Sequence, residues 1–357
     1  MSRRTYRKNA HAKGFTLVEV MVGMTLGLLT AVIIMQVFMV FENQKRTTTA
    51  VSEAQENGLM TLVQLEQAAR SAGSGLTNLA ALECTSVHSY LNGISPAPGW
   101  PSALGPGAPG VPLAPVVITD GGAGGADTIT TVQGADFLGS IAATLTGTMP
   151  QPSSELEVSR TLGFADGDLI LVSQNGNCTV MQVTHVQTAP AKLQHNPGAG
   201  GPYNPPAAFQ NDNGWPAYTT GANIISLNST GFAVNTYRVS NSDLRLTVNS
   251  APEVTIVKDI VSVQAKYGVA PTNAQDVSQW VDATGEWASN ALDVAHVKRI
   301  KAIKLTVVAR SNKKEAGNVT TNFPGDVDIS AVPDWQRYRY RVYNTIIPLR
   351  NIIWSNL

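Results

Sequence analysis

The first part of the chain holds one long run of apolar residues. The 22 consecutive positions 20–41 carry no ionisable side chain, and as a helix they would rise by about 33 Å, enough to cross a bilayer. A secretory signal peptide has a shorter apolar run followed by a cleavage site of small residues, and residues 36–42 offer no such site. The pattern predicts a membrane-spanning helix that stays in the mature protein.

A helical pattern continues beyond the apolar run. Apolar and small residues recur at spacings of three and four, which places them on one stripe of a helix: Val51, Ala54, Gly58, Leu62, Leu65 and Ala69. Polar side chains occupy the other faces, and Gly73 supplies a stop signal. We expect one helix over residues 15–72, with residues 15–41 in lipid and the amphipathic residues 42–72 packed on a head domain rather than in a coiled coil.

Residues 73–357, the expected head, have the pattern of a β-rich domain. Alternating or continuous apolar runs predict strands at 169–173, 179–186, 232–239, 244–248, 254–263, 300–309 and 335–345. Few helices separate them, which favours antiparallel pairing. Two Gly- and Pro-rich tracts, 93–125 and 189–222, predict surface loops, with an exposed contact surface as the alternative. The fold class is therefore α+β, a long N-terminal helix packed on an antiparallel head.

Charge is distributed unevenly along the chain. The whole sequence has 25 Lys and Arg against 25 Asp and Glu, but residues 1–14 hold five bases and no acid. The remainder, with 20 bases and 25 acids, is net −5. A basic leader on residues 1–14 stays on the cytoplasmic side of a membrane, which puts the head outside. The acidic body argues against general binding of nucleic acid.

The two cysteines, Cys84 and Cys178, lie 94 positions apart. Neither belongs to a C-x-x-C motif or a Cys/His cluster, which argues against a zinc site. Export from the cytoplasm makes a disulfide the first expectation, although the spacing alone does not decide whether the two cysteines are bonded.

Signatures of catalysis are missing from the sequence. It contains no Walker A, H-E-x-x-H, G-x-S-x-G or EF-hand pattern. The glycines of 121–125 lead into a strand, which predicts a hairpin loop rather than a phosphate-binding loop. Asp326, Asp328 and Asp334 could offer oxygens to calcium, but they are too few to specify a site and we expect solvated turn acids. The sequence predicts a non-enzymatic protein without cofactor or metal.

Three arginines near the C-terminus alternate with tyrosine and valine. On a strand, Arg337, Arg339 and Arg341 would share one face. We favour a structural or inter-subunit role for this row over contact with phosphates.

One carboxylate interrupts the N-terminal apolar segment. Glu19 lies where an unpaired charge is costly. The residues Lys-Gly-Phe-Thr-Leu-Val-Glu at 13–19 resemble the class III signal of type IV pilins and pseudopilins. The resemblance implies that a prepilin peptidase cuts between Gly14 and Phe15 and methylates the new N-terminal Phe15. It also implies that Glu19 meets the N-terminal amine of a neighbouring subunit, since a buried pair is penalised far less than either charge alone.

Three further segments resemble the minor pilins called PilW, which are similar to the J-type minor pseudopilins of type II secretion. They are residues 65–73, residues 167–173 shortly before Cys178, and the ending at 337–354. The resemblance implies an inner-membrane protein with a periplasmic head, later part of the pilus. Its partners would be other minor pilins, the major pilin and the inner-membrane assembly platform, in a complex that primes the pilus tip and supports motility or adhesion. Two alternatives stay open: a minor pseudopilin of type II secretion, and a tip adhesin or DNA-contacting subunit.

Overall fold

The computed structural model describes most of the chain and divides it into two units. The described residues are 14, 16–74, 86–95, 114–133, 142–149, 155–198, 200–227, 233–248, 251–272 and 274–351. Phe15, Cys84 and most of the first Gly/Pro tract (96–113) lie outside them. The first unit is Met1–Ser52 and the second is Glu53–Leu357.

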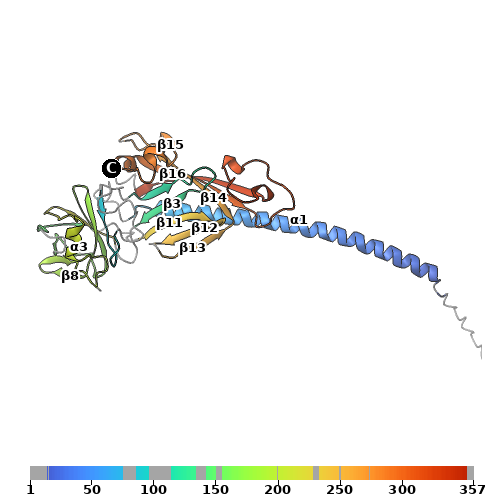
Figure 1. The fold of residues 1–357 in the computed structure, drawn as a ribbon, viewed down its shortest axis with the longest axis horizontal. Coiled ribbons are helices and arrows are strands. Elements are labelled where there is room, and N and C mark those ends of the chain that lie inside the picture. The colour runs from blue at the N-terminus through green and yellow to red at the C-terminus, as the bar shows by residue number, and fades with distance from the viewer. Residues whose placement is uncertain are drawn as a thin grey trace, which may run out of the picture. The chain divides into compact units, whose positions relative to one another are not determined.

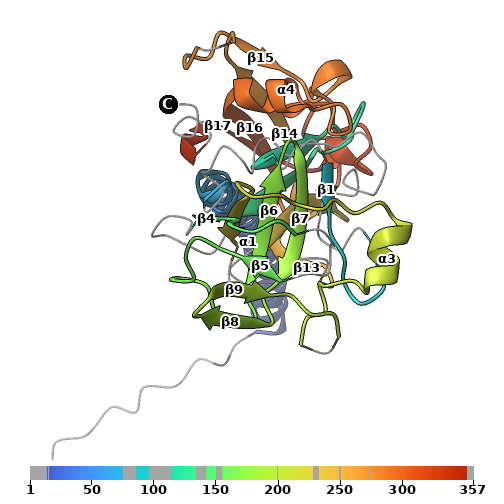
Figure 2. The same ribbon diagram turned by 90° about the vertical axis from the view of Figure 1, so that its left-hand side faces the viewer.

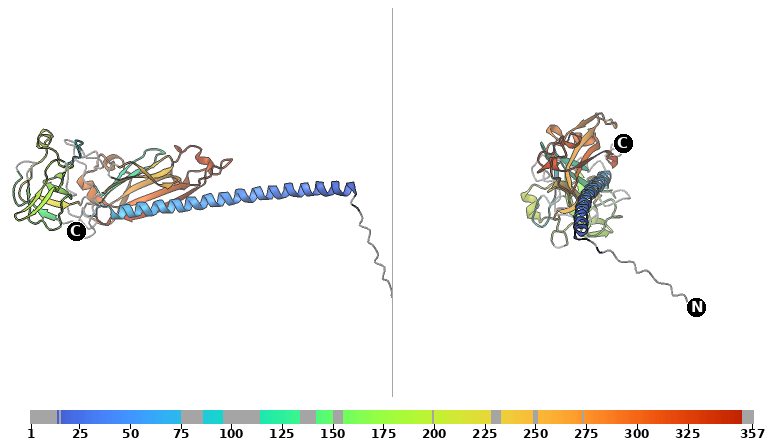
Figure 3. Two further views of the ribbon diagram at one scale, coloured as in Figure 1. Left: turned by 90° about the horizontal axis from the view of Figure 1, so that it is seen from below. Right: turned by 90° about the vertical axis from the view of Figure 1, so that its right-hand side faces the viewer.

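The longest element is helix α1 (Leu17–Ser71), 55 residues without interruption (Figure 3). Side chains from 17 to 41 are exposed, and the helix is long and apolar enough to cross a membrane. The long helix expected at 15–72 is confirmed. It ends where predicted, because Gly73 takes a positive φ of 76° that other residues rarely adopt.

Within the second unit, α1 packs through the stripe read from the sequence. Ala54, Leu65 and Ala69 are buried. Gly58 lies so close to the Tyr343 ring that a Cβ built there would be 2.3 Å from the ring edge. The absence of a side chain at this position therefore lets a strand of the head approach the helix.

Two antiparallel sheets pack with α1. One has the order β13 (Val254–Lys258), β12 (Asp243–Val248), β11 (Ala233–Ser240), β3 (Thr128–Gln133) and β2 (Val116–Thr119). The other has the order β15 (Gln279–Val281), β14 (Ile260–Val269), β16 (Ile300–Arg310) and β17 (Tyr340–Pro348). Short helices η2 (Gly285–Trp287) and α4 (Val294–Arg299) connect β15 to β16. Apolar side chains of both sheets and of α1 form one cluster, which we call the helix-side core.

A second group of strands lies at the other end of the head from the loops that precede β17 (Figures 1 and 2). One sheet has the order β1 (Ser86–His88), β7 (Asn177–Gln182), β6 (Leu169–Gln174), β10 (Asn223–Ser226) and β4 (Ala142–Thr144). A smaller sheet has the order β5 (Leu156–Glu157), β9 (Ala191–Gln194) and β8 (His185–Thr188). Only the β1–β7 pair departs, among the described strands, from the antiparallel pairing that the sequence predicts.

The sheet that contains β6 is apolar on both faces. Leu169 and Leu171 belong to the helix-side core, whereas Ile170 and Val172 belong to a separate cluster, the distal core, whose members lie between residues 143 and 224. Because successive side chains of a strand point to opposite faces, both cores receive residues from one strand. This explains why residues 169–173 read as a continuous apolar run.

Most predicted strands are present, but three have different boundaries. The segment 254–263 forms two strands, β13 and β14, because Asp259 between them has a positive φ of 58°. The segment 179–186 is divided between β7 and β8, which are separated by Val183 and Thr184. Residues 335–345 begin with the 3₁₀ turn η4 (Trp335–Arg337) rather than with a strand. The second Gly/Pro tract is also more than loop, since it contains β9 and helix α3 (Ala207–Asp212).

Candidate assembly site

At the N-terminal end of α1, Thr16 and Glu19 form reciprocal hydrogen bonds. The Thr16 backbone N–H and hydroxyl donate to Glu19 Oε2 at 2.9 and 3.0 Å, and the Glu19 N–H donates to Thr16 Oγ1 at 3.3 Å. This reciprocal arrangement is a capping box, which satisfies two backbone donors at the start of a helix. The T-x-x-E spacing is visible in the sequence, but the capping box is not among the features predicted above.

Glu19 is an exposed carboxylate on an apolar helix. The side chains that follow it along α1, from Val20 to Phe41, are exposed and almost entirely apolar. Within a bilayer such a carboxylate needs a partner, and a carboxylate with one oxygen engaged by Thr16 still has a second oxygen that can accept hydrogen bonds. Gly14 is exposed as well, while Phe15 lies outside the described residues. The second carboxylate oxygen of Glu19 is therefore a hydrogen-bond acceptor at the start of the helix.

The other end of α1 is fixed to the head by three hydrogen bonds from different segments. Ser71 Oγ donates to Gln133 Oε1 at 2.8 Å, and the Gly73 N–H donates to the Val132 carbonyl at 2.7 Å. Asn351 Nδ2 donates to the Ala72 carbonyl at 2.8 Å. The bond to the Ala72 carbonyl satisfies an acceptor that a helix end would otherwise leave unpaired. Together the three bonds join the end of α1 to β3 and to the residues after β17.

The loop at 121–125 connects β2 and β3 as a hairpin, as expected. Sequence reasoning missed its anchor, Asp127, which is 4% exposed. Its carboxylate accepts from the Gly121 N–H at 3.0 Å and from the Ala265 N–H on β14 at 2.7 Å. Burial raises the pKa of Asp127 above its usual value. This carboxylate has a structural task, since it joins the two sheets of the helix-side core.

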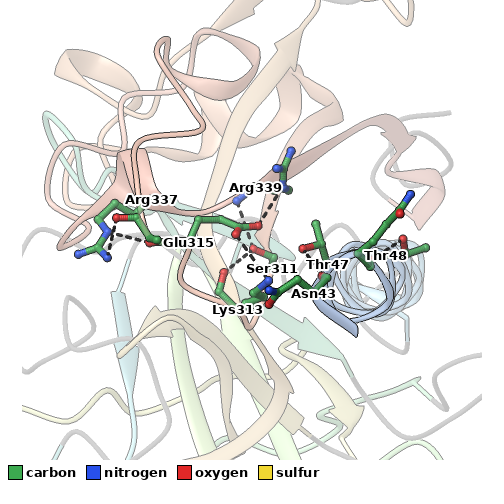
Figure 4. Close-up of polar contacts among 10 residues, drawn as sticks. Asn43, Thr47, Thr48, Ser311, Lys313, Glu315, Arg337 and Arg339 are labelled. Carbon is green, nitrogen blue, oxygen red and sulfur yellow. Dashed lines mark hydrogen bonds and ion pairs between the residues drawn. The ribbon is translucent and has the colours of Figure 1, made fainter. Parts of the chain in front are cut away.

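The predicted row of arginines is not formed. Arg337 lies in η4, Arg339 lies between η4 and β17, and only Arg341 belongs to the strand. Arg339 Nε pairs with Glu315 at 3.2 Å, and Arg337 Nε donates to the Glu315 carbonyl at 2.9 Å (Figure 4). The Ser311 N–H donates to the Arg339 carbonyl at 2.7 Å. The arginines therefore hold the loop after β16, which is the structural role favoured from the sequence, but in a different geometry.

The aspartates considered for calcium serve as turn residues. Asp328 Oδ1 accepts from the Ser330 N–H at 2.8 Å, and Asp334 pairs with Lys314 Nζ at 2.5 Å. In the part of the chain that the structure describes, no group of three or more His, Cys, Asp or Glu side chains could hold a metal ion. Cys178 is fully buried on β7. Cys84 is not among the described residues, so the disulfide stays a prediction.

Two segments of the chain match known families. Residues 225–351 match the family of type IV pilus-assembly protein W, and residues 9–35 match the prokaryotic N-terminal methylation motif. A solved type IV-like pilin from Thermus thermophilus is similar at 13% identity and a TM-score of 0.18, over 53% of this chain and 87% of that one. No curated protein matches the sequence. The methylation motif includes Gly14, Phe15 and Glu19, and the other match begins within β10 and extends beyond β17.

Proposed function

We propose that this chain, a type IV pilus-associated pilin with a methylation motif and a PilW-family domain, is a minor pilin that primes pilus assembly at the tip. The presence of both segments in one chain carries the proposal. The motif marks a precursor of a pilus subunit, and the PilW-family domain relates the head to a pilus-assembly protein rather than to a secretion protein. Its partners are then other minor pilins, the major pilin, the prepilin peptidase and the inner-membrane assembly platform.

The chemistry of the N-terminus follows from this proposal. The peptidase removes the leader after Gly14 and methylates Phe15, which leaves a positively charged amine at the start of an apolar helix. Such an amine and the carboxylate of Glu19 each carry a large penalty in lipid, and pairing between subunits removes most of it. The pair is therefore a registry device, because two helices are matched only when the amine of one lies beside Glu19 of the other.

The location follows in the same way. The precursor is a single-pass protein of the inner membrane with its head in the periplasm, in agreement with the basic leader. It then leaves the bilayer with its partners and becomes part of the pilus.

Processing is tested by intact mass and N-terminal sequencing of the membrane-extracted protein, with and without the prepilin peptidase. We expect a chain that begins at N-methylated Phe15 only when the peptidase is present. A leader that stays intact, or cleavage beyond Phe41, would contradict the proposal.

The role of Glu19 is tested by Glu19→Gln, which removes the charge and keeps the shape. We expect normal processing, but pilus numbers per cell that fall toward those of a strain without this gene. Glu42→Gln is the matched control, since Glu42 is an acid of the same helix just after the apolar run and pairs with Arg46. Wild-type pilus numbers in the Glu19→Gln strain would contradict the proposed registry role of Glu19.

The strain without this gene also tests whether the protein serves a pilus or a secretion system. Loss of surface pili with normal export of secreted proteins supports the minor pilin. The reverse result would support a minor pseudopilin of type II secretion instead.

A further inference from the structure

Strand β17 lies at the edge of its sheet and is the longest edge strand among the described residues. It has nine residues, whereas the other edge strands have between two and five. Proteins usually shorten, bulge or charge such a strand, because its unpaired backbone groups can pair with another chain. The pairing of β17 with β16 has no bulge, and residues 342–348 carry no charge. The strand therefore lacks most of the features that protect an edge.

The register decides which backbone groups of β17 point away from β16. Along an antiparallel pair, residues that exchange two hydrogen bonds alternate with residues that exchange none. At both ends of the pair an odd-numbered residue on the β17 side, Leu349 or Arg339, bonds to the β16 side. The register between these ends is unbroken. The N–H and C=O groups of Val342, Asn344 and Ile346 therefore face the free edge.

Pro348 fits this assignment. Its nitrogen carries no hydrogen, and the register places that nitrogen on the free edge, the side on which a strand tolerates proline. The row of outward N–H groups therefore ends at Ile346. Among the described residues, no hydrogen bond beyond the pairing with β16 uses the backbone of 342, 344 or 346.

Apolar side chains are exposed on both sides of this edge. On the side of α1, Tyr343 Oη donates to the Gln55 carbonyl at 3.2 Å (Figure 2). Leu59, one turn further along the same side of α1, is 50% exposed. On the other face of the sheet, Ile346 is 56% exposed. A strand added at this edge would lie beside both side chains, which favours apolar residues in it.

The charges around the edge are all positive. Arg341 and Arg350 flank the uncharged residues, and Lys304 lies opposite Ile346 on β16. All three cations are exposed, and none forms an ion pair with a described side chain. A second copy of β17 would bring the same cations and no acid, and like charges across a strand pair are destabilising. Acidic residues complement this edge better.

We propose that the free edge of β17 binds an extended segment of another protein, which adds a strand to the four-stranded sheet. The middle of that segment is uncharged and largely apolar, where it lies along Asn344 and Ile346. Acidic residues at its ends lie near Arg341, Lys304 and Arg350. Main-chain hydrogen bonds supply the affinity and side chains the selectivity. The inference depends on the sheet alone and not on a role in pilus assembly.

Hydrogen exchange of the full-length chain in detergent, with a synthetic peptide as the probe, tests this site. The probe is Glu-Val-Thr-Val-Thr-Val-Glu, and a second probe has Lys in place of both Glu residues. We expect the acidic probe to slow exchange severalfold at the amides of 342, 344 and 346, and the basic probe to have a smaller effect. The amides of 343, 345 and 347 should not change, because they already bond to β16. No protection by the acidic probe, equal protection by both probes, or protection without this alternation would overturn the proposal.

A proline variant tests the backbone contact. Ile346→Pro removes one outward N–H and no bond to β16, so it should abolish most of the protection. Unchanged exchange at 343 and 345 in the free variant shows that the strand is still formed. A variant with intact β17 that binds the acidic probe as the wild type does would contradict the assignment of the edge.

Charge reversal tests the choice of partner. Lys304→Glu combined with Arg341→Glu should shift the preference from the acidic to the basic probe. Lys258→Glu combined with Arg238→Glu makes the same change of charge on the other sheet of the helix-side core and should leave the preference as it is. An equal shift in both double variants would refute the local charge argument. Protection of 342, 344 and 346 that rises with protein concentration and needs no probe would identify a second copy as the occupant and overturn the acidic segment.

Discussion

The two cores of the head differ in how they are connected to the rest of the molecule. The helix-side core contains residues of α1, such as Leu65 and Ala69, together with both sheets around it. The distal core contains no described residue of α1, and its members all lie between 143 and 224. The match to the pilus-assembly family begins at residue 225. The part that resembles the family therefore contributes to the helix-side core from residue 225 onward, and the distal core lies on the other face of a sheet that both cores share.

This difference implies that the two cores serve different ends. A helix that must enter an assembly requires a head that is firmly fixed to it, and the helix-side core supplies that attachment. The distal core is free of this requirement. Its loops and its second Gly/Pro tract can differ in sequence without disturbing the packing of α1.

The largest expected effect concerns Cys84 and Cys178, which we predict to be bonded. A bond closing a loop of this length contributes about 4–5 kcal/mol in the chain-entropy model. Because Cys178 belongs to the helix-side core, the bond would fix the chain that follows α1 to the shared sheet. We expect Cys84→Ala/Cys178→Ala to lower the free energy of unfolding in urea by about that amount, and reduced wild-type protein to behave like the variant. Two reactive thiols in unreduced protein, detected by alkylation and mass, would contradict the pairing.

A pair of leucines tests whether the cores are separate. Leu65 belongs to the helix-side core and Leu193 to the distal core, and both are buried. Each change to Ala should cost about 2–5 kcal/mol. We expect Leu65→Ala to speed hydrogen exchange in the head-bound part of α1, and Leu193→Ala to speed it only at 142–224. If either variant speeds exchange equally everywhere, the head unfolds as one unit and the distinction is lost.

The smallest effect is a dependence on pH that arises from Asp127. A carboxyl group whose pKa is raised in the folded state destabilises the fold once it is ionised, so its contribution improves as the pH falls through the raised pKa. We expect the free energy of unfolding of the wild type, relative to Asp127→Asn, to rise as the pH is lowered from neutral. Asp328→Asn is a control of opposite sign, because the Ser330 N–H lowers the pKa of Asp328. A flat difference for Asp127→Asn would contradict the assignment.

Local patterns in the sequence predicted most of the helix and strand positions. The helix and the strands β6, β11, β12 and β16 were predicted within a few residues, since the periodicity of side chains is set by nearby positions. Two of the errors occurred where a non-glycine residue takes a positive φ. Asp259 divides one predicted strand and Asp334 precedes the turn η4, and a hydrophobic pattern contains no mark of either.

The residues of the candidate site also divide into those that a local motif predicts and those that only the fold brings together. Gly14, Phe15 and Glu19 could be predicted because their motif spans seven residues. Asp127 could not, because its partner Ala265 is 138 positions away and only the pairing of sheets brings them together. The row of arginines was wrong for a similar reason, since the backbone after Asp334 turns before it becomes a strand.

The sheet shared by the two cores has one further consequence. Most side chains of β6 and β7 are apolar on both faces, so a shift of one residue between the strands would mainly exchange apolar side chains between the two cores. Apart from Thr179, whose hydroxyl is hydrogen-bonded to Tyr218, polarity therefore holds little information about their alignment. That information lies in the two residues that join them, Asn175 and Gly176, whose positive φ angles of 52° and 79° fit the tight turn that pairs Gln174 with Asn177. Two residues that belong to neither core thus decide which side chains each core contains.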